Sequence, residues 1–535
     1  MGRGALTRLA LLALGFILTL LLLAYVLYPQ TRVWVLGLPA LSRVFSSWAN
    51  WEALWGSLAL SLLTVAGSLL LGALLAWGVA VLQAPGHRWV SVLASLPLAL
   101  PPFVGVVALY LLVGEGGWLG GYLRGTSAVW LVHVYALHAY AYLFTRARLE
   151  QADASWWEAA ALLGAGPMRR FLRITAPVLW PAWRRAALLV FLLSMSSFTA
   201  PLLFAPDQRF LTTQVYYYKL NGDLGAASAL SVVLALVGLC VFLLLERFAL
   251  SSRAASKGSP RPLRYRPRKG IRMLWAVFFG AYAFFVLAPL FVLAALSCIE
   301  NPAQWLAGLS PRWTLEHYRR LFAEPETLRP LWSSFEMAGL SVAAVVPLGL
   351  GVAYLARRLR AGRLLLGLAL LPYALPGTVV GINLLAAFSA PSPLAFGGVL
   401  VGTFWILPLT YCVRTLPLGV QAAASGLEAL DERLLEAARL LGARGSYLAR
   451  RLVVPLLAPA LLGGALLIFM QAATEFVASV LLYTHANRPV SVEIFSYLRL
   501  FDLGAAAAYS VLLVLVLGLL SLLFRQPSRW MSGWG

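Results

Sequence analysis

The amino-acid sequence predicts an all-α polytopic membrane protein, with about twelve transmembrane helices arranged as two parallel six-helix repeats. Hydrophobic residues make up 61% of the 535 positions and charged residues only 12%, whereas soluble domains carry about 25% charged residues. Runs of about twenty apolar residues recur along the chain, and each is long enough to cross a hydrocarbon core of about 30 Å as a helix. A polar-edged segment also occurs twice, at equivalent places in the two halves.

Six spans are predicted in each half. The first apolar run follows Arg3 and Arg8 and is longer than the apolar core of a signal peptide, which has about 7–15 residues. No A-x-A cleavage pattern follows it, so we expect it to be a retained span. The spans of the first half are predicted at 9–28, 54–82, 89–113, 127–146, 184–206 and 226–248. Those of the second half are predicted at 271–297, 333–356, 363–389, 394–416, 459–483 and 505–524.

A basic segment separates the halves. Residues 251–272 are rich in Ser, Pro, Gly and Arg and contain no acidic residue. We therefore predict a first transmembrane domain at 1–250, a cytoplasmic linker at 251–272 and a second transmembrane domain at 273–535. The positive-inside rule puts the linker in the cytoplasm. Counting six spans in each direction puts both termini there, including Arg525 and Arg529. The formal charge of +22 then reflects membrane topology rather than nucleic-acid binding.

The repeated segment reads "EAAALLGAGPMRRFLRITAPVLWPA" from position 158 and "EAARLLGARGSYLARRLVVPLLAPA" from position 436. The two copies align without a gap at an interval of 278 residues, and about half of the aligned positions are identical, which indicates an internal duplication. Each copy lies between the predicted fourth and fifth spans of its half. Because six spans separate the copies, both are expected on the cytoplasmic face.

Each copy is predicted to form a short helix, a turn and a second helix. Asp153 and Asp431 are expected N-caps. Gly164 and Gly442 occupy the position where a left-handed residue ends a helix. Pro177 and Pro181 in the first copy, like Pro455 and Pro459 in the second, are expected to interrupt the second helix and redirect the chain into the next span.

The charge of Glu158 and Glu436 falls in the middle of these helices, so capping does not explain it. The small side chains of the alanines allow another surface to approach one face of each helix closely, and the leucines form an apolar edge. This combination is typical of a docking element. Two copies favour a partner with two equivalent pockets. The alternative is an interfacial loop whose arginines contact anionic lipid.

These segments resemble the EAA motif of inner-membrane permease subunits of binding-protein-dependent ABC importers, in which E-A-A is followed by three residues and a glycine. The resemblance covers both halves and implies a fused permease with the type I ABC importer fold in the bacterial inner (plasma) membrane. It further implies that each loop is a coupling helix entering one subunit of an ATPase dimer, and that a periplasmic or lipid-anchored binding protein delivers the solute. The implied coupling residues are Glu158, Ala159, Ala160, Gly164, Glu436, Ala437, Ala438 and Gly442.

No G-x-x-x-x-G-K-[ST] loop occurs in the chain, so any ATP is expected to bind to a separate subunit. No H-E-x-x-H motif or Cys/His/Asp cluster occurs either. We therefore expect no catalytic residue, no metal ligand and no cofactor in this chain. An integral-membrane enzyme is disfavoured for the same reason. An ion-coupled secondary transporter is disfavoured because such proteins frequently have inverted rather than parallel repeats.

The solute is predicted from the ends of the two halves, which share "DLGAA" and look most like fused permeases of the ferric-iron group. Thiamine and spermidine/putrescine permeases are the alternatives. Glu475 is an ionisable residue inside a predicted span, where such side chains usually face a cavity or a partner. We expect Glu475 and its counterpart Ser197 to line the pathway. A helix–helix hydrogen bond is the alternative for Glu475. For His133 and His138, interhelical hydrogen bonding is favoured over metal ligation.

Overall fold

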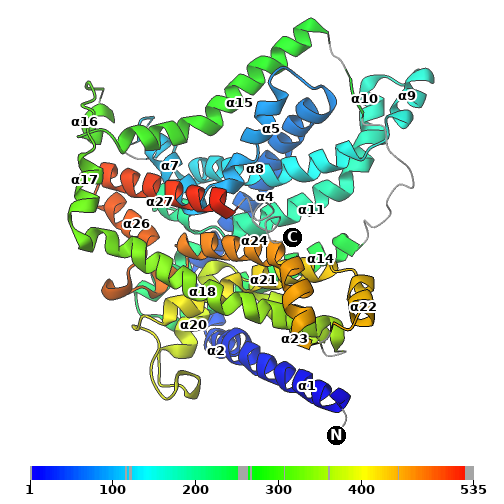
Figure 1. Cartoon of the computed structure of the whole chain (residues 1–535). Helices are drawn as coiled ribbons and strands as arrows, with labels where there is room; N and C mark the ends of the chain where they lie inside the picture. Colours follow the sequence, from blue (N-terminus) through cyan, green and yellow to red (C-terminus); the bar gives the residue numbers. More distant parts are fainter. Residues whose placement is uncertain are drawn as a thin grey trace. The chain divides into compact units, whose positions relative to one another are not determined.

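The computed structural model describes residues 3–114, 117–119, 123–250, 263–265, 268–306, 308–359, 362–443 and 445–524 (Figure 1). Over these residues the regular structure is helical, apart from isolated bridges such as the antiparallel one between Ile299 and Trp313. The predicted all-α class is confirmed. Most of the predicted linker, and the C-terminal arginines used to predict topology, lie outside the described residues.

Nine helical stretches of the described chain are long and apolar enough to cross a membrane. Two further helix pairs meet the same test together, which brings the total to eleven if each pair is one span. The chain is therefore polytopic, as predicted. The nine stretches are Leu11–Gly37, Trp48–Val81, Gly125–Glu150, Pro167–Met195, Leu224–Leu245, Lys269–Leu296, Pro325–Arg358, Arg450–Ala473 and Leu503–Leu522.

The two helix pairs correspond to the third predicted span of each half. His87–Ala99 and Pro102–Val113 meet at 107°, and Gly362–Ala374 and Gly377–Phe388 meet at 111°. Both breaks fall at a Leu-Pro step, where Leu100 (ψ 142°) and Leu375 (ψ 124°) are extended. A residue before proline is disfavoured in the α region, because the proline ring clashes with its backbone. These predicted straight spans are thus sharply bent.

Three further spans differ in position from the prediction, among them the one expected at 459–483, whose helix ends at Ala473 and is followed by a break. The helix expected at 394–416 begins at Ile406 and continues to Glu428, and it is not among the candidate spans. Gly397 and Gly402, with φ of +81° and +89°, prevent a continuous helix before it. The helix expected at 184–206 ends earlier, at Met195, and is followed by a break.

By its internal contacts the described chain divides into two compact units, and each unit contains segments from both halves of the sequence. Unit 2 comprises Phe45–Gln214 and Leu236–His317. Its helices are α4 (Trp48–Ala76), η2 (Trp77–Val81), α5 (His87–Leu93), α6 (Leu96–Ala99), α7 (Pro102–Val113), α8 (Gly125–Glu150), α9 (Ala154–Leu162), α10 (Pro167–Arg170), η3 (Phe171–Thr175), α11 (Ala176–Met195), α12 (Thr199–Phe204), α15 (Lys269–Leu296) and α16 (Pro302–Leu306).

Unit 1 comprises Met1–Val44, Val215–Ala235 and Tyr318–Gly535. The division falls inside α3 (Leu41–Phe45), α13 (Leu211–Leu220), α14 (Leu224–Leu250) and α17 (Glu316–Ala323). The helices that lie wholly in unit 1 are α1 (Arg3–Leu22), η1 (Leu23–Leu27), α2 (Tyr28–Gly37), α18 (Pro325–Arg358), α19 (Gly362–Leu370), η4 (Leu371–Ala374), α20 (Gly377–Phe388), η5 (Pro393–Ala395), α21 (Ile406–Glu428), α22 (Glu432–Leu440), α23 (Gly445–Leu448), η6 (Ala449–Val453), α24 (Val454–Ala473), α25 (Ser479–Leu482), η7 (His485–Asn487), α26 (Val490–Arg499) and α27 (Leu503–Phe524).

Each unit is built around three helices that correspond through the repeat. In unit 2 these are α4, α8 and α11, and in unit 1 they are α18, α21 and α24. Glycines allow the helices to approach closely. A Cβ at Gly72 would lie 2.6 Å from the backbone nitrogen of Tyr142, and one at Gly349 would lie 2.5 Å from the carbonyl carbon of Gly419. Small residues at such crossings are typical of helix packing in membranes.

In each unit the three-helix centre is joined by the first helix of the opposite half of the sequence. In unit 2, α15 packs against α7 and α5. His138 Nε2 on α8 lies 2.7 Å from the hydroxyl of Tyr282 on α15, so the predicted interhelical hydrogen bond is confirmed for this residue. In unit 1, α2 packs against α20, and the amide of Asn383 donates to Gln30 Oε1 at 2.6 Å. Buried polar bonds thus fix both helices in place.

Candidate functional site

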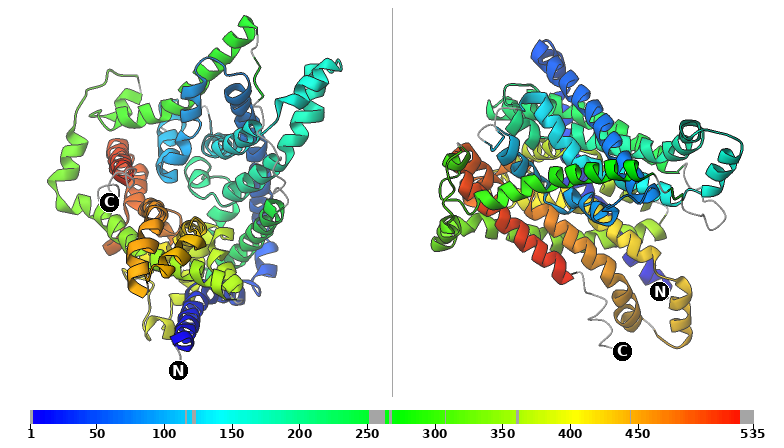
Figure 2. Two further views of the ribbon diagram at one scale, coloured as in Figure 1. Left: turned by 45° about the vertical axis from the view of Figure 1, so that its right-hand side comes forward. Right: turned by 90° about the horizontal axis from the view of Figure 1, so that it is seen from above.

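The first repeated segment forms the short helix α9, which projects beyond the ends of α8 and α11 (Figures 1 and 2). The carboxylate of Asp153 accepts a hydrogen bond from the backbone N–H of Ser155 at 3.0 Å. At the other end Gly164 has φ of +75°. The N–H of Ala165 donates to the carbonyl of Ala160 at 2.9 Å. This is the Schellman pattern of helix termination, so the predicted caps are confirmed.

The second segment forms α22 with the same construction. Asp431 accepts from the N–H of Arg433 at 2.9 Å. Gly442 has φ of +88°, and the N–H of Ala443 donates to the carbonyl of Ala438 at 3.0 Å. The two helices therefore begin and end at equivalent residues of the repeat.

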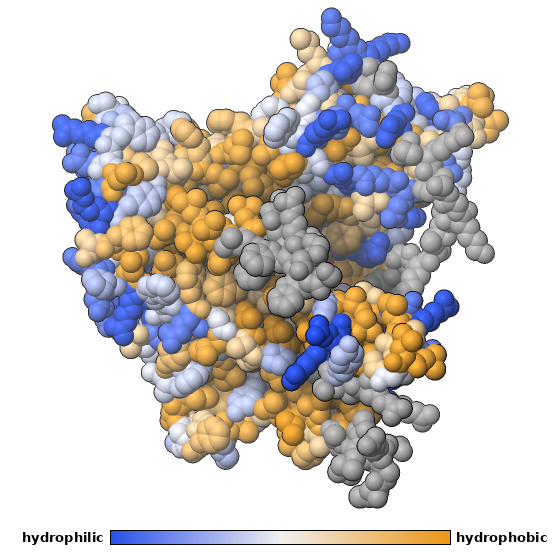
Figure 3. Space-filling model, in the orientation of Figure 1, coloured by the Kyte–Doolittle hydropathy of each residue, from blue (hydrophilic) through white to orange (hydrophobic). Residues whose placement is uncertain are grey.

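Both helices expose an apolar tip. Leu162, Leu163, Leu440 and Leu441 are 88–89% exposed, and apolar side chains gather over α9 and over α22 in Figure 3. Glu158 and Ala159 are exposed beside the first tip, as are Glu436 and Ala437 beside the second, while Ala160 and Ala438 are half-buried. Pairs of leucines this exposed at the end of a rigid helix form a surface suited to a protein partner.

Contacts that the sequence did not reveal hold α9 against its own unit. The guanidinium of Arg170 lies 4.7 Å from the centre of the Trp157 ring, and the indole N–H of Trp157 donates to Thr175 Oγ1 at 2.7 Å. Trp77 and Phe171 complete the aromatic cluster. The basic residue Arg170 thus serves partly to fix the helix. In the second copy the position of Trp157 is taken by Leu435.

A single π-helical turn lies within each repeated segment. It spans Phe171–Thr175 in the first copy and Ala449–Val453 in the second, again at equivalent positions. The predicted interruptions at Pro177, Pro181, Pro455 and Pro459 do not occur, because α11 and α24 continue through these residues. A proline removes one helical hydrogen bond and crowds the carbonyl four residues earlier. At Pro177 and Pro455 the π-turn places its extra residue where that crowding falls, which allows the helix to continue.

The fifth helix of each half is broken after α11 in the first half and after α24 in the second. Ser197 lies between α11 and α12, and Glu475 lies between α24 and α25. In both halves a hydroxyl of a later helix donates to the carbonyl of the residue at the break, at 2.7 Å in each case. Thr212 of α13 donates to Ser197, and Ser491 of α26 donates to Glu475. The structure thus places the two predicted pathway residues at matching interruptions.

Glu475 has a partner that sequence reasoning missed. Its side chain is 7% exposed and forms an ion pair with Arg414 of α21, whose side chain is 20% exposed. Glu475 Oε1 also accepts from the N–H of Ala478 at 2.9 Å. Arg414 packs against Gly377, where a Cβ would lie 2.6 Å from Nη1. An arginine inside the apolar run at 394–416 was the available signal for this pair.

Metal ligands do not gather in the part of the chain that the structure covers, where no three His, Cys, Asp or Glu residues are placed to hold an ion. The candidate functional surfaces are those of α9 and α22, which occur at equivalent positions in the two copies of the repeat.

Comparison with known families agrees with this repeated architecture. The family described as the binding-protein-dependent transport system inner membrane component matches the chain twice, at residues 68–253 and 345–531. The chain belongs to this family. It is therefore a multi-pass inner-membrane permease of an ABC importer. It is not the ATPase of that importer.

Relatives of the permease cover much of its length. The probable ABC transporter permease protein y4fN of Sinorhizobium fredii is 27% identical over 94% of this chain and 92% of its own length. The ferric transport system permease protein FbpB of Actinobacillus pleuropneumoniae is 27% identical over 81% of this chain and 65% of its own length. The spermidine/putrescine transport system permease protein PotB of Escherichia coli is 29% identical over 41% of this chain and 84% of its own length.

Proposed function

We propose that the permease imports ferric iron and is driven by a separate ATPase that docks on α9 and α22. The observation that carries the docking proposal is the pair of identically capped helices with exposed leucine tips. An ATPase dimer offers two equivalent surfaces, and the duplicated helices are two equivalent ligands for them. In this proposal ATP binds to the separate ATPase and not to this chain.

In this proposal the permease has a first transmembrane domain at 1–250, a basic cytoplasmic linker at 251–272 and a second transmembrane domain at 273–535. One family match in each half supports this division. Both termini, α9 and α22 then lie in the cytoplasm, and a binding protein delivers the solute to the opposite face.

Each coupling surface consists of a glutamate, two alanines and a glycine: Glu158, Ala159, Ala160 and Gly164 in the first, and Glu436, Ala437, Ala438 and Gly442 in the second. The alanines leave room for close approach, and the exposed leucines fill an apolar pocket of the partner. The glutamate fixes the orientation by pairing with a basic group. Each glycine ends its helix so that the leucines stand at the tip.

Reversing the charge of both glutamates tests the docking role. The Glu158→Lys/Glu436→Lys variant should insert normally but retain roughly tenfold less ATPase on co-purification, because close charge pairs at an interface contribute strongly to binding. The matched control is Glu300→Lys/Glu326→Lys, which reverses two exposed carboxylates on the predicted outer side. Unchanged ATPase retention by the first variant would refute the docking role.

Ferric iron is proposed as the solute because FbpB is a relative over most of this chain. The permease, its ATPase and its binding protein are reconstituted in proteoliposomes, and ATP-dependent accumulation of labelled ferric iron is expected. Thiamine and spermidine/putrescine are the competing solutes, the second being favoured by the relative PotB. Accumulation of either of these, without iron, would replace ferric iron as the assigned solute.

Glu475 and Ser197 are proposed to border the pathway at the two helix breaks. Because Glu475 is already paired with Arg414, a cation crossing this level does not meet a free carboxylate. The asymmetry between a charged pair and a serine is therefore proposed to shape the pathway rather than to bind iron tightly.

A further inference from the structure

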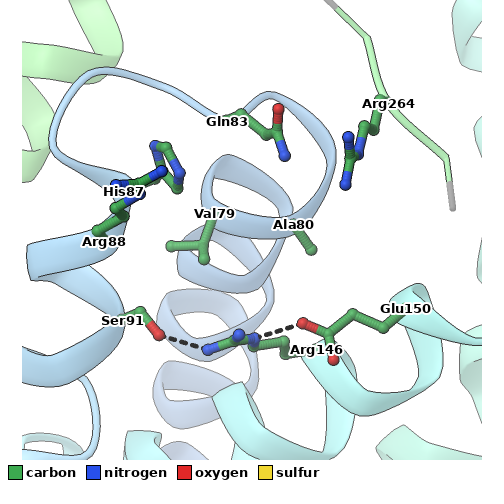
Figure 4. A pocket seen from close by; sticks show the side chains of 9 residues that line it. All are labelled: Val79, Ala80, Gln83, His87, Arg88, Ser91, Arg146, Glu150 and Arg264. Carbon is green, nitrogen blue, oxygen red and sulfur yellow. Dashed lines mark hydrogen bonds and ion pairs between the residues drawn. The ribbon is translucent and has the colours of Figure 1, made fainter.

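A pocket of about 380 Å³ lies in unit 2, where the turn between η2 and α5 meets the end of α8 (Figure 4). Three arginines line it, each from a separate segment: Arg88 from α5, Arg146 from α8, and Arg264 from residues 263–265. His87 also lines it, and Glu150 is the one acidic residue among the described residues of its lining. The pocket therefore carries a net positive charge.

Only one of the three arginines is neutralised. Arg146 donates to Glu150 Oε1 at 2.7 Å and to the hydroxyl of Tyr142 at 3.0 Å, and it also bonds Ser91 Oγ. Arg88 and Arg264 have no hydrogen bond or ion pair anywhere in the described ranges. In Figure 4 these two arginines stand on opposite sides of the pocket. Two unpaired guanidinium groups facing a common space attract an anion with several acceptor oxygens.

The walls that carry these groups are fixed by the backbone. The turn before α5 uses positive φ at Gln83 (+44°) and Gly86 (+84°). The segment bearing Arg264 is tied to the same region, because the N–H of Tyr265 donates to the carbonyl of Val81 at 2.9 Å and Leu263 is buried in the core. Arg264 is thus held at the pocket by main-chain and apolar contacts.

The surroundings point to lipid as the source of the anion. The pocket lies at the ends of two candidate spans, Trp48–Val81 and Gly125–Glu150. Next to it α5 exposes Trp89 and Val92, at 77% and 63%, and α15, which packs against α5, exposes Leu274. Basic pockets at this level bind anionic head groups, while tryptophan marks the membrane interface.

The second half of the sequence does not repeat this pocket. At the constant interval of 278 residues, the counterpart of Arg146 is Ala424. The equivalent three-helix packing of unit 1 therefore forms without an arginine at this position, so the packing does not require one.

We propose that this pocket binds a phosphate-bearing anion, supplied by the head group of an anionic phospholipid. The phosphate lies between Arg88 and Arg264, and the acyl chains lie along the exposed apolar residues of α5 and α15. The proposal is independent of the transported solute and of the ATPase-docking surfaces.

The test measures retention of phosphatidylglycerol by the purified full-length chain in phosphatidylcholine nanodiscs, by native mass spectrometry. Arg88→Gln/Arg264→Gln should weaken retention roughly 30-fold, since each arginine near an anionic surface contributes a similar, additive term. The control Arg357→Gln/Arg363→Gln removes two exposed arginines elsewhere on the predicted cytoplasmic side and should retain the lipid. Equal retention by the pocket variant and the wild type would overturn the proposal, as would equal loss in the control.

A second variant should change phosphatidylglycerol retention in the opposite direction, and it keeps all three arginines. Glu150→Gln frees Arg146, so it should strengthen phosphatidylglycerol retention, and unchanged or weaker retention counts against the pocket. Millimolar inorganic phosphate distinguishes the sources of the anion. Failure of phosphate to compete supports the lipid head group, whereas full competition together with absent lipid retention overturns the lipid assignment and leaves a site for free phosphate.

Discussion

Arg414 and Glu475 show how a single residue pair changes the interpretation of a site. Glu475 taken alone is an isolated intramembrane charge, which usually indicates a pathway. With Arg414 beside it and the N–H of Ala478 capping it, the carboxylate is also a structural element that joins α21 to the break after α24. The structural role and the pathway role are therefore distinguished by removing both charges in the Arg414→Gln/Glu475→Gln variant.

We predict that Glu475→Gln destabilises the permease by about 3–5 kcal/mol, because Arg414 is left with an uncompensated buried charge. The Arg414→Gln/Glu475→Gln variant should recover most of this loss, since no charge remains unpaired. Thermal unfolding in detergent measures both. Equal stability of wild type and Glu475→Gln would contradict the buried ion pair.

Transport by the double variant then addresses the pathway role. If Glu475 borders the pathway, the double variant should assemble normally but import solute at an altered rate. Normal uptake by a stable double variant would make Glu475 a structural residue only.

The shared "DLGAA" phrase stands at the start of the last helix of each half. In both halves its aspartate caps the last helix: Asp223 accepts from the N–H of Ala226 at 2.9 Å, and Asp502 accepts from the N–H of Ala505 at 3.1 Å. The N–H of Ala226 and the neighbouring Arg43 hold the pKa of Asp223 below its ordinary value. The phrase is thus accounted for by capping of α14 and α27 and carries no direct information on the solute.

Helix pairs in the centre of each unit depend on individual glycines. We predict that Gly349→Ala destabilises the permease by about 1–3 kcal/mol, because the new methyl group meets the backbone of α21 at Gly419. Gly339→Ala on the same helix is the matched control. Nothing lies within 4 Å of a Cβ there, so it should be neutral or stabilise by up to about 1 kcal/mol through helix propensity. Thermal unfolding in detergent distinguishes the two, and equal effects would refute the close crossing.

The whole molecule depends on both coupling helices facing one compartment. We predict that single cysteines at Leu163 and Leu441, in a background without Cys240, Cys298 and Cys412, react with an impermeant maleimide only from the cytoplasmic side. A cysteine at Glu300 should react only from the outside. Labelling of Leu163 and Leu441 from opposite sides would exclude their common role, because one ATPase dimer could not reach both.

Much of this architecture was predictable from local sequence. The caps at Asp153 and Gly164 and at Asp431 and Gly442 follow from short-range backbone chemistry, so the duplicated helices were correctly expected in detail. The polytopic class follows from apolar run length. The bends at Leu100 and Leu375 were missed although a proline follows each, because both lie within otherwise continuous apolar runs.

By itself the sequence determined the membrane class, the parallel duplication and the two exposed capped helices, since each depends on composition or on contacts a few residues apart. Only the tertiary structure decided that Arg414 pairs with Glu475, that α15 and α2 join helices of the opposite half, and that Arg88, Arg146 and Arg264 line one pocket. These contacts join residues that are far apart along the chain. No local pattern encodes them, because their energy comes from side chains that meet only after the helices have packed.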